Sequence, residues 1–398
     1  MERDVQVVVI GAGQAGLAAA HGLVRGGLAP GRDLLVLDSN DGPGGAWRHR
    51  WDSLTFDRAH GLADLPGLRL GRPDPTVPAS QVVSGYYGRY EEMLGLEVVR
   101  PATVTAVTAD DGAEGPLTVA WQRNGAGHSV RAAVVVSATG TWTRPFVPYV
   151  PGIATFRGEQ VHTAGFTDAQ HFAGRRTVVV GGGLSAVQFL LQLAPVTETV
   201  WATRRPPNFT CRQFNLEWGR DVEVAVRART EAGLASVSVV RTTGIPLWPD
   251  YLRAVDEGIL VSRGMFNRIT PGGVIFDGEP MDAQTAADGF GPSAADRLVL
   301  PKSWRPFEEP TVVDAEVIFW NTGFRAALDH LNRLHLRGSG GGIVMRDEVE
   351  VVADHRVLLV GYGSSASTIG ATRAGRKAAS VALTRLGRTV PRATTRQG

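Results

Sequence analysis

The sequence predicts an α/β protein built from two doubly wound, Rossmann-like dinucleotide-binding domains. Two glycine-rich turns indicate this fold, GAGQAG at residues 11–16 and GGGLSA at residues 181–186. Each turn lies between a short apolar run and a helix-forming stretch, which is the strand–turn–helix context that the dinucleotide fingerprint requires. A single turn of this kind is weak evidence. Two of them in one chain indicate that the protein binds two dinucleotides.

The composition fits a large globular protein. The 398 residues are 43% hydrophobic, so the chain can bury an extensive core, and its length predicts two or three domains. The 41 basic and 39 acidic residues give a net charge of only +2, which argues against nucleic acid or an anionic membrane as partner. We find no apolar run of about 18 residues that would predict a membrane span. The N-terminus lacks the pattern of a secretory signal, so we expect the protein in the cytoplasm.

Cys211 is the single cysteine of the chain. One thiol cannot form an intramolecular disulfide or the CxxC pair of a dithiol-active flavoprotein reductase. We expect a small, at least partly buried side chain without a redox role. The nine histidines show no metal-ligand spacing, so the sequence predicts no metal site.

The first half of the chain begins with a βαβ unit. Residues 5–10 form an apolar run typical of a buried parallel strand, and residues 15–25 predict a helix that ends at Gly26. Residues 42–78 contain many glycine, proline and aromatic residues, and a loop of this length is expected to wrap a ligand. The other elements predicted in this half are strands at 34–37, 97–107, 117–122 and 134–137 and a helix at 81–94.

The βαβ pattern restarts after a proline-containing stretch that resembles a linker, with prolines at 145, 148 and 151. Residues 206–310 predict only loops, a helix or two and weak strands. The remaining predictions are strands at 177–180, 199–202, 315–320 and 357–360 and a helix at 185–194. We therefore predict one domain at residues 1–148 and 312–398, interrupted by a second domain at residues 149–311.

The first glycine-rich turn has the residue types that a dinucleotide needs. Gly11 permits the tight turn, Gly13 lets the backbone approach a pyrophosphate, and Gly16 lets helix and strand pack closely. The start of the following helix offers free N–H groups and a partial positive charge to the phosphates. Asp38 ends the next strand, where a carboxylate can accept hydrogen bonds from both ribose hydroxyls. This acid favours a nucleotide with a free 2′-hydroxyl, such as FAD or NAD.

The second turn differs at the corresponding strand end, because Arg204 and Arg205 stand there instead of an acid. Guanidinium groups pair with a 2′-phosphate, so this half is predicted to bind NADPH rather than NADH. Two solvated arginines remain the alternative interpretation, since the chain is rich in arginine. The last glycine position of the turn is Ala186, an accepted variant of the fingerprint.

The stretch before the second turn resembles the fingerprint of the class B flavin-containing monooxygenases, Phe-x-Gly-x-x-x-His-x-x-x-aromatic. Here it is carried by Phe156, Gly158, His162 and Phe166. The resemblance extends from residue 5 to about residue 385 and is weakest between residues 206 and 310. Within the family, the chain most resembles a bacterial group connected with cation transport and the plant YUCCA enzymes. Other similar segments are GGAW at 44–47, WDSL at 51–54, LPG at 65–67, ATG at 138–140, NTG at 321–323, VGYG at 360–363 and SAS at 365–367.

This resemblance implies an NADPH-dependent, FAD-containing monooxygenase. The first domain would bind FAD and the second NADPH, and the enzyme would form a C4a-(hydro)peroxyflavin and use O2 to oxygenate a small organic substrate. Phe166, in place of Trp, favours oxygenation at N or S. Baeyer–Villiger oxygenation of a ketone, an NADPH oxidase or diaphorase, and a flavin-binding regulatory or transport-associated protein stay open as alternatives. For the oligomeric state, a homodimer is left open.

The candidate catalytic residue is Asp57, which stands where relatives carry the Asn or His that reaches the flavin. We interpret His162 as a structural hinge rather than an acid–base group, and Trp47, Trp51 and Phe56 either shield the flavin or pack. The predicted FAD-binding residues are Gly11, Gly13, Gln14, Ala15, Gly16, Asp38, Gly45, Ala46, Trp47, Val104, Thr139, Gly140, Gly361 and Thr368. The predicted NADPH-binding residues are Gly181, Gly183, Leu184, Ser185, Ala186, Arg204 and Arg205.

Overall fold

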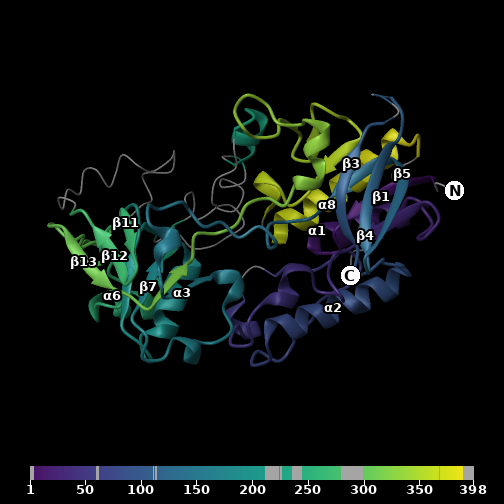
Figure 1. The fold of residues 1–398 in the computed structure, drawn as a ribbon. Helices are drawn as coiled ribbons and strands as arrows, with labels where there is room; N and C mark the ends of the chain where they lie inside the picture. Colours follow the sequence, from purple (N-terminus) through teal and green to yellow (C-terminus); the bar gives the residue numbers. More distant parts are fainter. Residues whose placement is uncertain are drawn as a thin grey trace. The chain divides into compact units, whose positions relative to one another are not determined.

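The computed structural model divides the chain into two compact units, each assembled from distant parts of the sequence (Figure 1). The first unit contains residues 1–143, 223–236 and 326–398, and the second contains residues 144–222 and 237–325. The structure describes residues 4–59, 62–110, 112, 114–210, 224, 226–234, 244–278, 299–366 and 368–388.

The first unit is built on a sheet in the order β15-β16-β17-β5-β1-β2, to which β4 and β3 are added as an antiparallel extension. The strands β1, β2, β5 and β17 run parallel, so their carboxyl ends lie at one edge. The strands are β1 (Asp4–Ile10), β2 (Leu34–Leu37), β3 (Thr103–Thr108), β4 (Leu117–Arg123), β5 (Ala126–Ser137), β15 (Met345–Arg346), β16 (Glu350–Val351) and β17 (Val357–Leu359).

Helices α1 (Gln14–Arg25) and α8 (Thr368–Arg385) pack closely against each other in this unit (Figure 1). Their contact depends on glycine, because a Cβ on Gly22 would lie 2.5 Å from the Ala379 Cβ. α2 (Ala79–Leu94) also packs against α1, with Tyr86, Tyr87 and Tyr90 buried in the core. The short 3-10 helices of the unit are η1 (Gly45–His49), η2 (Phe56–Arg58), η8 (Asp329–Leu334) and η9 (Gly363–Ala366).

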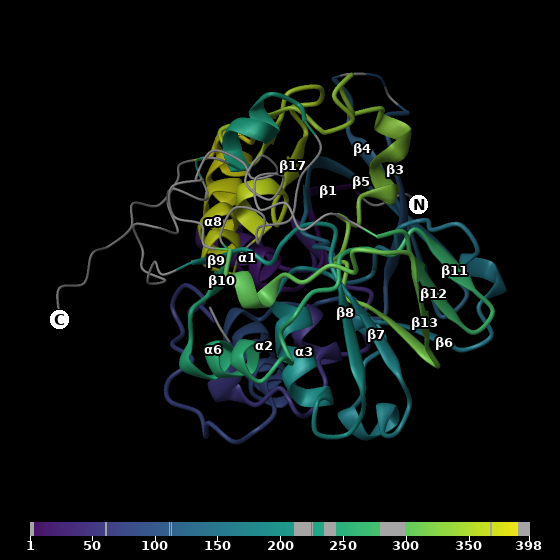
Figure 2. The ribbon, with the colours of Figure 1, turned by 90° about the vertical axis from the view of Figure 1, so that its left-hand side faces the viewer.

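The second unit contains a parallel four-stranded sheet in the order β6-β14-β7-β8, of which β6, β7 and β8 are labelled in Figure 2. These strands are β6 (Glu159–His162), β7 (Thr177–Val180), β8 (Thr199–Ala202) and β14 (Val317–Trp320). The other elements are α3 (Leu184–Leu193), α6 (Pro249–Asp256), the pair β9 (Phe209–Thr210) and β10 (Ile245–Pro246), the antiparallel set β11 (Arg268–Thr270), β12 (Gly273–Phe276) and β13 (Thr311–Asp314), and the 3-10 helices η3 (Ile153–Thr155), η4 (Thr163–Gly165), η5 (Ala169–Phe172) and η7 (Pro301–Ser303).

The predicted α/β class with two dinucleotide-binding units is confirmed, but the predicted domain bounds were wrong in three places. The described residues 224 and 226–234 were predicted in the second domain, whereas they belong to the first unit. Residues 312–325 were assigned to the first domain, whereas β14 is an inner strand of the second sheet, paired with β6 and β7. The first boundary falls between residues 143 and 144 rather than after 148. The predicted strand 134–137 is also too short. Its continuation to Ala126 pairs with β4 as a half-exposed hairpin, where alternating polar residues hide the strand pattern.

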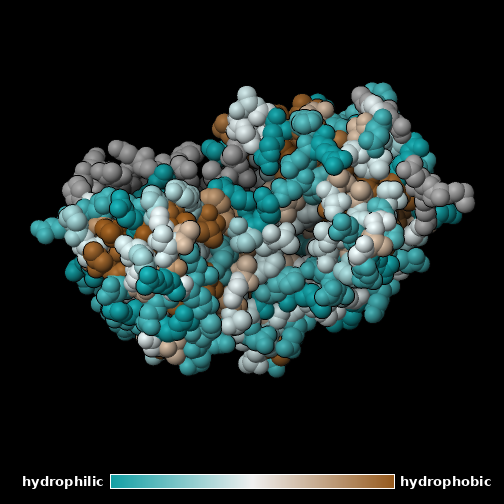
Figure 3. All heavy atoms as spheres, viewed as in Figure 1, coloured by the Kyte–Doolittle hydropathy of each residue, from teal (hydrophilic) through white to brown (hydrophobic). Residues whose placement is uncertain are grey.

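The surface of both units is mainly hydrophilic on the face drawn in Figure 3, with smaller apolar patches. Isolated exposed apolar side chains are normal in globular proteins. Among the helices that the structure describes, none is long and apolar enough to cross a membrane.

Candidate functional site

The first glycine-rich turn connects β1 to α1 at the carboxyl edge of the parallel sheet. Gly11 has φ +101°, and a Cβ there would lie 2.6 Å from the Ala138 carbonyl oxygen. A Cβ on Gly16 would lie 1.9 Å from the Gly11 carbonyl oxygen. Contacts below 3 Å cannot be tolerated by backbone atoms, so these two glycines are required by the fold itself.

The fold itself does not require a glycine at position 13. Gly13 has an ordinary extended backbone with φ −87°, and a Cβ there would meet nothing nearer than the Gly45 Cα at 3.9 Å. Gly13 is the N-cap of α1, no side chain caps the helix, and its first turn contains no acidic residue. The N–H groups at such a helix start are available to a phosphate. The open side at Gly13 therefore fits a bound pyrophosphate.

Several predicted FAD-binding residues meet at this edge. Gly45, with φ +53°, lies against the turn, since a Cβ on it would be 2.9 Å from the Gly13 Cα. Gly361 lies beside Gly140, where a Cβ on Gly361 would be 3.9 Å from the Gly140 Cα. Thr139 donates its hydroxyl to the Ala327 carbonyl at 2.7 Å and so fixes the end of β5.

Gln14 was predicted to bind the cofactor, but its side chain is occupied by the protein. Its amide nitrogen donates to the Ala63 carbonyl at 2.9 Å and to the Thr372 hydroxyl at 2.7 Å. Its amide oxygen accepts a hydrogen bond from the Tyr87 hydroxyl at 2.5 Å. Burial raises the pKa of Tyr87, which stays a neutral donor. Only the backbone of Gln14 is left for a ligand, and its side chain joins the turn to α2 and α8.

Asp38 follows β2 and is almost fully buried. Its Oδ2 accepts from the Arg100 Nε at 2.9 Å and its Oδ1 from the Asn40 amide at 3.2 Å. Arg100 also pairs with both carboxylate oxygens of Glu91, each at 2.7 Å. Each Asp38 oxygen has a further lone pair, so it can still accept from a ribose hydroxyl. The sequence predicted Asp38 at this site but not its partner Arg100, because the two residues are 62 positions apart in the chain.

The remaining predicted FAD residues have other surroundings. Ala46 and Trp47 belong to η1 and are exposed and half-buried, respectively. Val104 lies in β3 opposite Trp121, partly buried against the core. Ala15 is buried in the first turn of α1. Thr368 begins α8, and its side chain is outside the described part of the structure.

Asp57, the candidate catalytic residue, lies in η2 and is exposed. The Thr55 hydroxyl donates a hydrogen bond to its carboxylate. The segment is held by backbone bonds from the Asp57 N–H to the Pro75 carbonyl at 3.2 Å and from the Phe56 N–H to the Val77 carbonyl at 2.9 Å. These bonds fix the segment that carries the exposed carboxylate, and Asp57 stays a candidate catalytic residue.

A buried pair at the end of β5 was not predicted. The Nε2 of His330, in η8, lies 3.0 Å from the Ser137 hydroxyl. Burial lowers the pKa of His330 to about 4, although the charge of Asp329 offsets part of the shift. His330 is therefore neutral near pH 7. No local motif marks this pair, because its members are 193 residues apart.

The second glycine-rich turn repeats the geometry of the first in the other unit. Gly181 has φ +137°, and a Cβ there would lie 2.2 Å from the Asn321 carbonyl oxygen. The Trp201 indole donates to the Gly181 carbonyl at 2.7 Å. α3 begins after Gly183 without a side-chain cap or an acidic first turn. Leu184 is half-buried, Ser185 is exposed and Ala186 is buried at the helix start.

Arg204 and Arg205 are exposed directly after β8, at the carboxyl edge of the second sheet. Thr203, which precedes them, donates its hydroxyl to the Arg205 carbonyl at 2.6 Å and lies 2.7 Å from the Ser262 hydroxyl. Among the described residues, no carboxylate forms an ion pair with Arg204. The strand end is therefore fixed while this guanidinium group faces solvent.

Each fingerprint residue before the second turn has a structural role. Gly158 allows close packing, since a Cβ there would lie 2.6 Å from the Phe156 ring. His162 accepts from the Ala164 N–H at Nδ1 (3.1 Å), and its Nε2 lies 3.0 Å from the Gly323 carbonyl. Burial lowers the pKa of His162, and the bond to Gly323 offsets part of that shift. Phe166 packs in a buried cluster of rings formed by Phe166, Phe172, Phe189 and Phe319.

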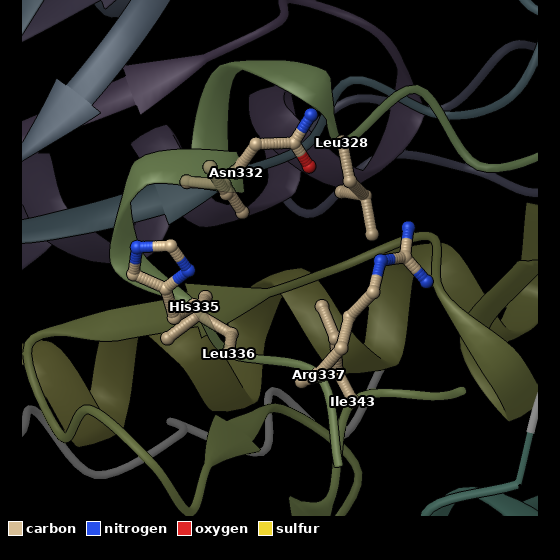
Figure 4. A pocket seen from close by; sticks show the side chains of 7 residues that line it. Leu328, Asn332, His335, Leu336, Arg337 and Ile343 are labelled. Atoms are coloured by element: carbon tan, nitrogen blue, oxygen red, sulfur yellow. The ribbon is translucent and has the colours of Figure 1, made fainter. Parts of the chain in front are cut away.

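One further feature of the described structure lies apart from the glycine-rich turns. A surface cavity of about 250 Å³ lies beside η8 and is lined by Asn332, His335 and Arg337 together with apolar side chains (Figure 4). Cys211 lies outside the described residues. The part of the chain that the structure describes contains no group of three His, Cys, Asp or Glu able to hold a metal ion.

The comparisons with known proteins decide the family. A family model described as pyridine nucleotide-disulphide oxidoreductase matches residues 8–242, more than half of the chain. The chain belongs to this family. The match includes both glycine-rich turns and the fingerprint between them.

Two similar curated proteins are named as monooxygenases. Indole-3-pyruvate monooxygenase YUCCA1 from rice (Oryza sativa subsp. japonica) is 35% identical over 188 residues, 47% of this chain and 44% of the relative. A Baeyer-Villiger monooxygenase from Streptomyces coelicolor is 30% identical over 208 residues, 52% of this chain and 39% of the relative. The matches thus span less than half the length of these curated relatives.

A solved structure matches almost from end to end. The flavin-containing monooxygenase from Stenotrophomonas maltophilia has a TM-score of 0.73 and 29% identity, covering 96% of this chain and 99% of that one. The resemblance to the class B flavin monooxygenases is therefore confirmed, and so is the fold that it implies.

Proposed function

We propose that the protein is a monooxygenase that binds FAD at the first glycine-rich turn and NADPH at the second and oxygenates a small organic substrate at N or S. One observation carries the proposal. Two uncapped helices begin at glycine-rich turns on parallel sheets, and the neighbouring strands end in opposite chemistry, the carboxylate of Asp38 in one unit and the exposed guanidinium of Arg204 in the other. The opposite charges of the side chains at these two strand ends support the binding of two different nucleotides.

In the first unit the residues fit FAD. Gly13 leaves room for the pyrophosphate, the α1 N–H groups donate to it, and Asp38 accepts from the ribose. Arg100 holds the Asp38 carboxylate in position through its Nε. When bound, FAD would accept two electrons and react with O2, since the cofactor supplies the redox chemistry.

In the second unit the residues fit NADPH. The start of α3 offers its N–H groups to the pyrophosphate, and Arg204 and Arg205 pair with the 2′-phosphate. The balanced reaction takes NADPH, a proton, O2 and the substrate to NADP⁺, water and the oxygenated product. A dithiol reductase activity is disfavoured, because the chain has only Cys211 and that chemistry needs a second thiol.

Asp57 is proposed to hold or accept a proton in this reaction, with its carboxylate oriented by the Thr55 hydroxyl. The half-buried Trp47 and the buried Trp51 are proposed to keep water from the flavin. Exclusion of water favours oxygenation over loss of hydrogen peroxide.

The proposal is tested by measuring whether NADPH consumption is coupled to product. The FAD-loaded protein is incubated with NADPH, O2 and a panel of sulfides, amines and ketones, and hydrogen peroxide and oxygenated products are quantified. Product from a sulfide or amine in step with NADPH supports the proposal. Stoichiometric hydrogen peroxide with every substrate indicates an oxidase, and no NADPH consumption indicates a binding protein.

Baeyer–Villiger oxygenation is the second candidate. The similarity to the Streptomyces coelicolor enzyme favours it. Formation of an ester or lactone from the ketones of the panel, without sulfoxide or N-oxide, would replace the first candidate by the second.

A further inference from the structure

Arg50 lies at the end of η1, inside a group of indole rings. Its N–H donates to the Trp47 carbonyl at 3.0 Å and closes the 3-10 helix. Its guanidinium carbon is 4.2 Å from the ring centroid of Trp142, 5.7 Å from that of Trp47 and 5.8 Å from that of Trp51. We call Trp47, Trp51 and Trp142 the indole cage.

The guanidinium group of Arg50 lacks a counterion within the described part of the chain. Its Nε is buried without a hydrogen-bond partner, and no described carboxylate forms an ion pair with it. Burial lowers its pKa to about 10. A buried charge without an anion is costly, and cation–π contacts compensate only part of that cost. This arrangement indicates a site that is completed by an anion.

Trp47 and Trp51 of the indole cage lie in or just after η1, the segment that meets the first glycine-rich turn, and Trp142 follows β5. Gly45, at the other end of η1, lies against Gly13, where the backbone is open to a pyrophosphate. His49 stacks on Trp142 and contacts Asn40 at 2.6 Å, and Asn40 donates to Asp38. Through these contacts the segment is linked on one side to the phosphate turn and on the other to the candidate ribose acid.

We propose that Arg50 is the counter-cation for the pyrophosphate of the dinucleotide held at the first glycine-rich turn. This inference rests on the proposed function, which places FAD at that turn. The indole cage orients the planar guanidinium group and shields it in part from water, which strengthens its hydrogen bonds to phosphate oxygens. The N–H groups of α1 and the guanidinium group would then bind the same anion.

The experiment measures binding of FAD, ADP and adenosine to the apoprotein by titration calorimetry, and thermal melting of the apoprotein. Arg50→Met should weaken FAD and ADP about 10- to 100-fold, as for loss of a charged hydrogen bond. Adenosine, which has no phosphate, should bind as before. The apoprotein of Arg50→Met should melt at the same or a higher temperature, because an unpaired buried charge is removed. Arg50→Lys should restore part of the affinity.

The matched control is Arg48→Gln, which alters an exposed arginine of the same 3-10 helix. It should leave all three affinities unchanged. Unchanged FAD and ADP binding in Arg50→Met overturns the proposal. A lower apoprotein melting temperature with unchanged affinities would show a merely structural cage. If wild-type protein binds no FAD, the proposed function fails instead.

Discussion

Gly45 and Gly13 face each other backbone to backbone, so closely that a Cβ on Gly45 would lie 2.9 Å from the Gly13 Cα. The contact brings the 3-10 helix η1 onto the start of α1. Because both residues are glycines, no side chain lies between the two backbones. The N–H groups at the start of α1 therefore stay accessible to a ligand. Two glycine motifs that are 32 positions apart in the sequence thus lie side by side at the start of α1, where we propose that the pyrophosphate binds.

The glycines of the first turn should separate folding from FAD binding. Gly13→Ala should change the free energy of unfolding of the apoprotein by about 0.5 kcal/mol or less, because the Cβ has room and the backbone is extended. The same variant should weaken FAD binding at least about 10-fold, because the Cβ stands where the pyrophosphate approaches. Urea unfolding and flavin fluorescence measure the two effects.

Gly16→Ala is the comparison variant. Its Cβ would lie 1.9 Å from the Gly11 carbonyl oxygen, so it should destabilise the apoprotein by about 2 to 4 kcal/mol. Equal destabilisation by Gly13→Ala and Gly16→Ala would show that the turn serves only the fold.

Arg204 and Arg205 should determine the preference for NADPH. The double variant Arg204→Ala with Arg205→Ala should raise the KM for NADPH about 10- to 100-fold, as expected when charged hydrogen bonds to a phosphate are lost. The KM for NADH should stay nearly constant, because NADH has no 2′-phosphate. Arg268→Ala, at an exposed arginine of β11, is the control. An equal loss with both nucleotides would contradict the assignment.

His330 should make the stability of the protein sensitive to acid. Its pKa is about 4 in the fold and 6.5 in the unfolded chain. The contribution of the neutral, buried His330 to the free energy of unfolding is therefore complete above about pH 6.5. It is lost as the pH falls toward 4, because in that range the imidazole takes up a proton in the unfolded chain but not in the folded protein. Between about pH 7.5 and pH 5 the loss should be about 2 kcal/mol. Unfolding of wild type and His330→Asn at both pH values measures it, and the same pH dependence in both proteins would refute it.

His162 should be dispensable for proton transfer. Both of its ring nitrogens face backbone groups, so we expect a structural role. His162→Asn keeps an acceptor near the Ala164 N–H and loses the contact with Gly323. It should lower the melting temperature while the pH profile of kcat keeps its shape. Loss of one limb of that profile would restore the acid–base interpretation.

The sequence predicted the parts of the site that depend on local pattern. The glycine turns, the strand ends and the fingerprint follow from residue types at fixed short spacing, and the structure places Gly11, Gly13, Gly140 and Gly361 at one sheet edge. The sequence could not predict pairs of residues that only the tertiary fold brings together. Arg100 beside Asp38, Tyr87 beside Gln14 and His330 beside Ser137 are all such pairs.

The predicted end of the second domain at residue 311 was wrong for a related reason. β14 reads as a buried apolar strand, and such a strand fits either parallel sheet equally well from its sequence. Its place between β6 and β7 depends on the pairing of whole strands across the second unit. Chain order suggested a return to the first domain, whereas the return occurs only after residue 325.

The most direct test of the account is an anaerobic titration of the FAD-loaded protein with NADPH, followed by visible absorbance of the flavin. We predict that one equivalent of NADPH per FAD bleaches the flavin, and that the Arg204→Ala and Arg205→Ala double variant needs a higher NADPH concentration for the same rate of bleaching. A protein that retains no FAD, or a bound flavin that NADPH leaves oxidised, would contradict it.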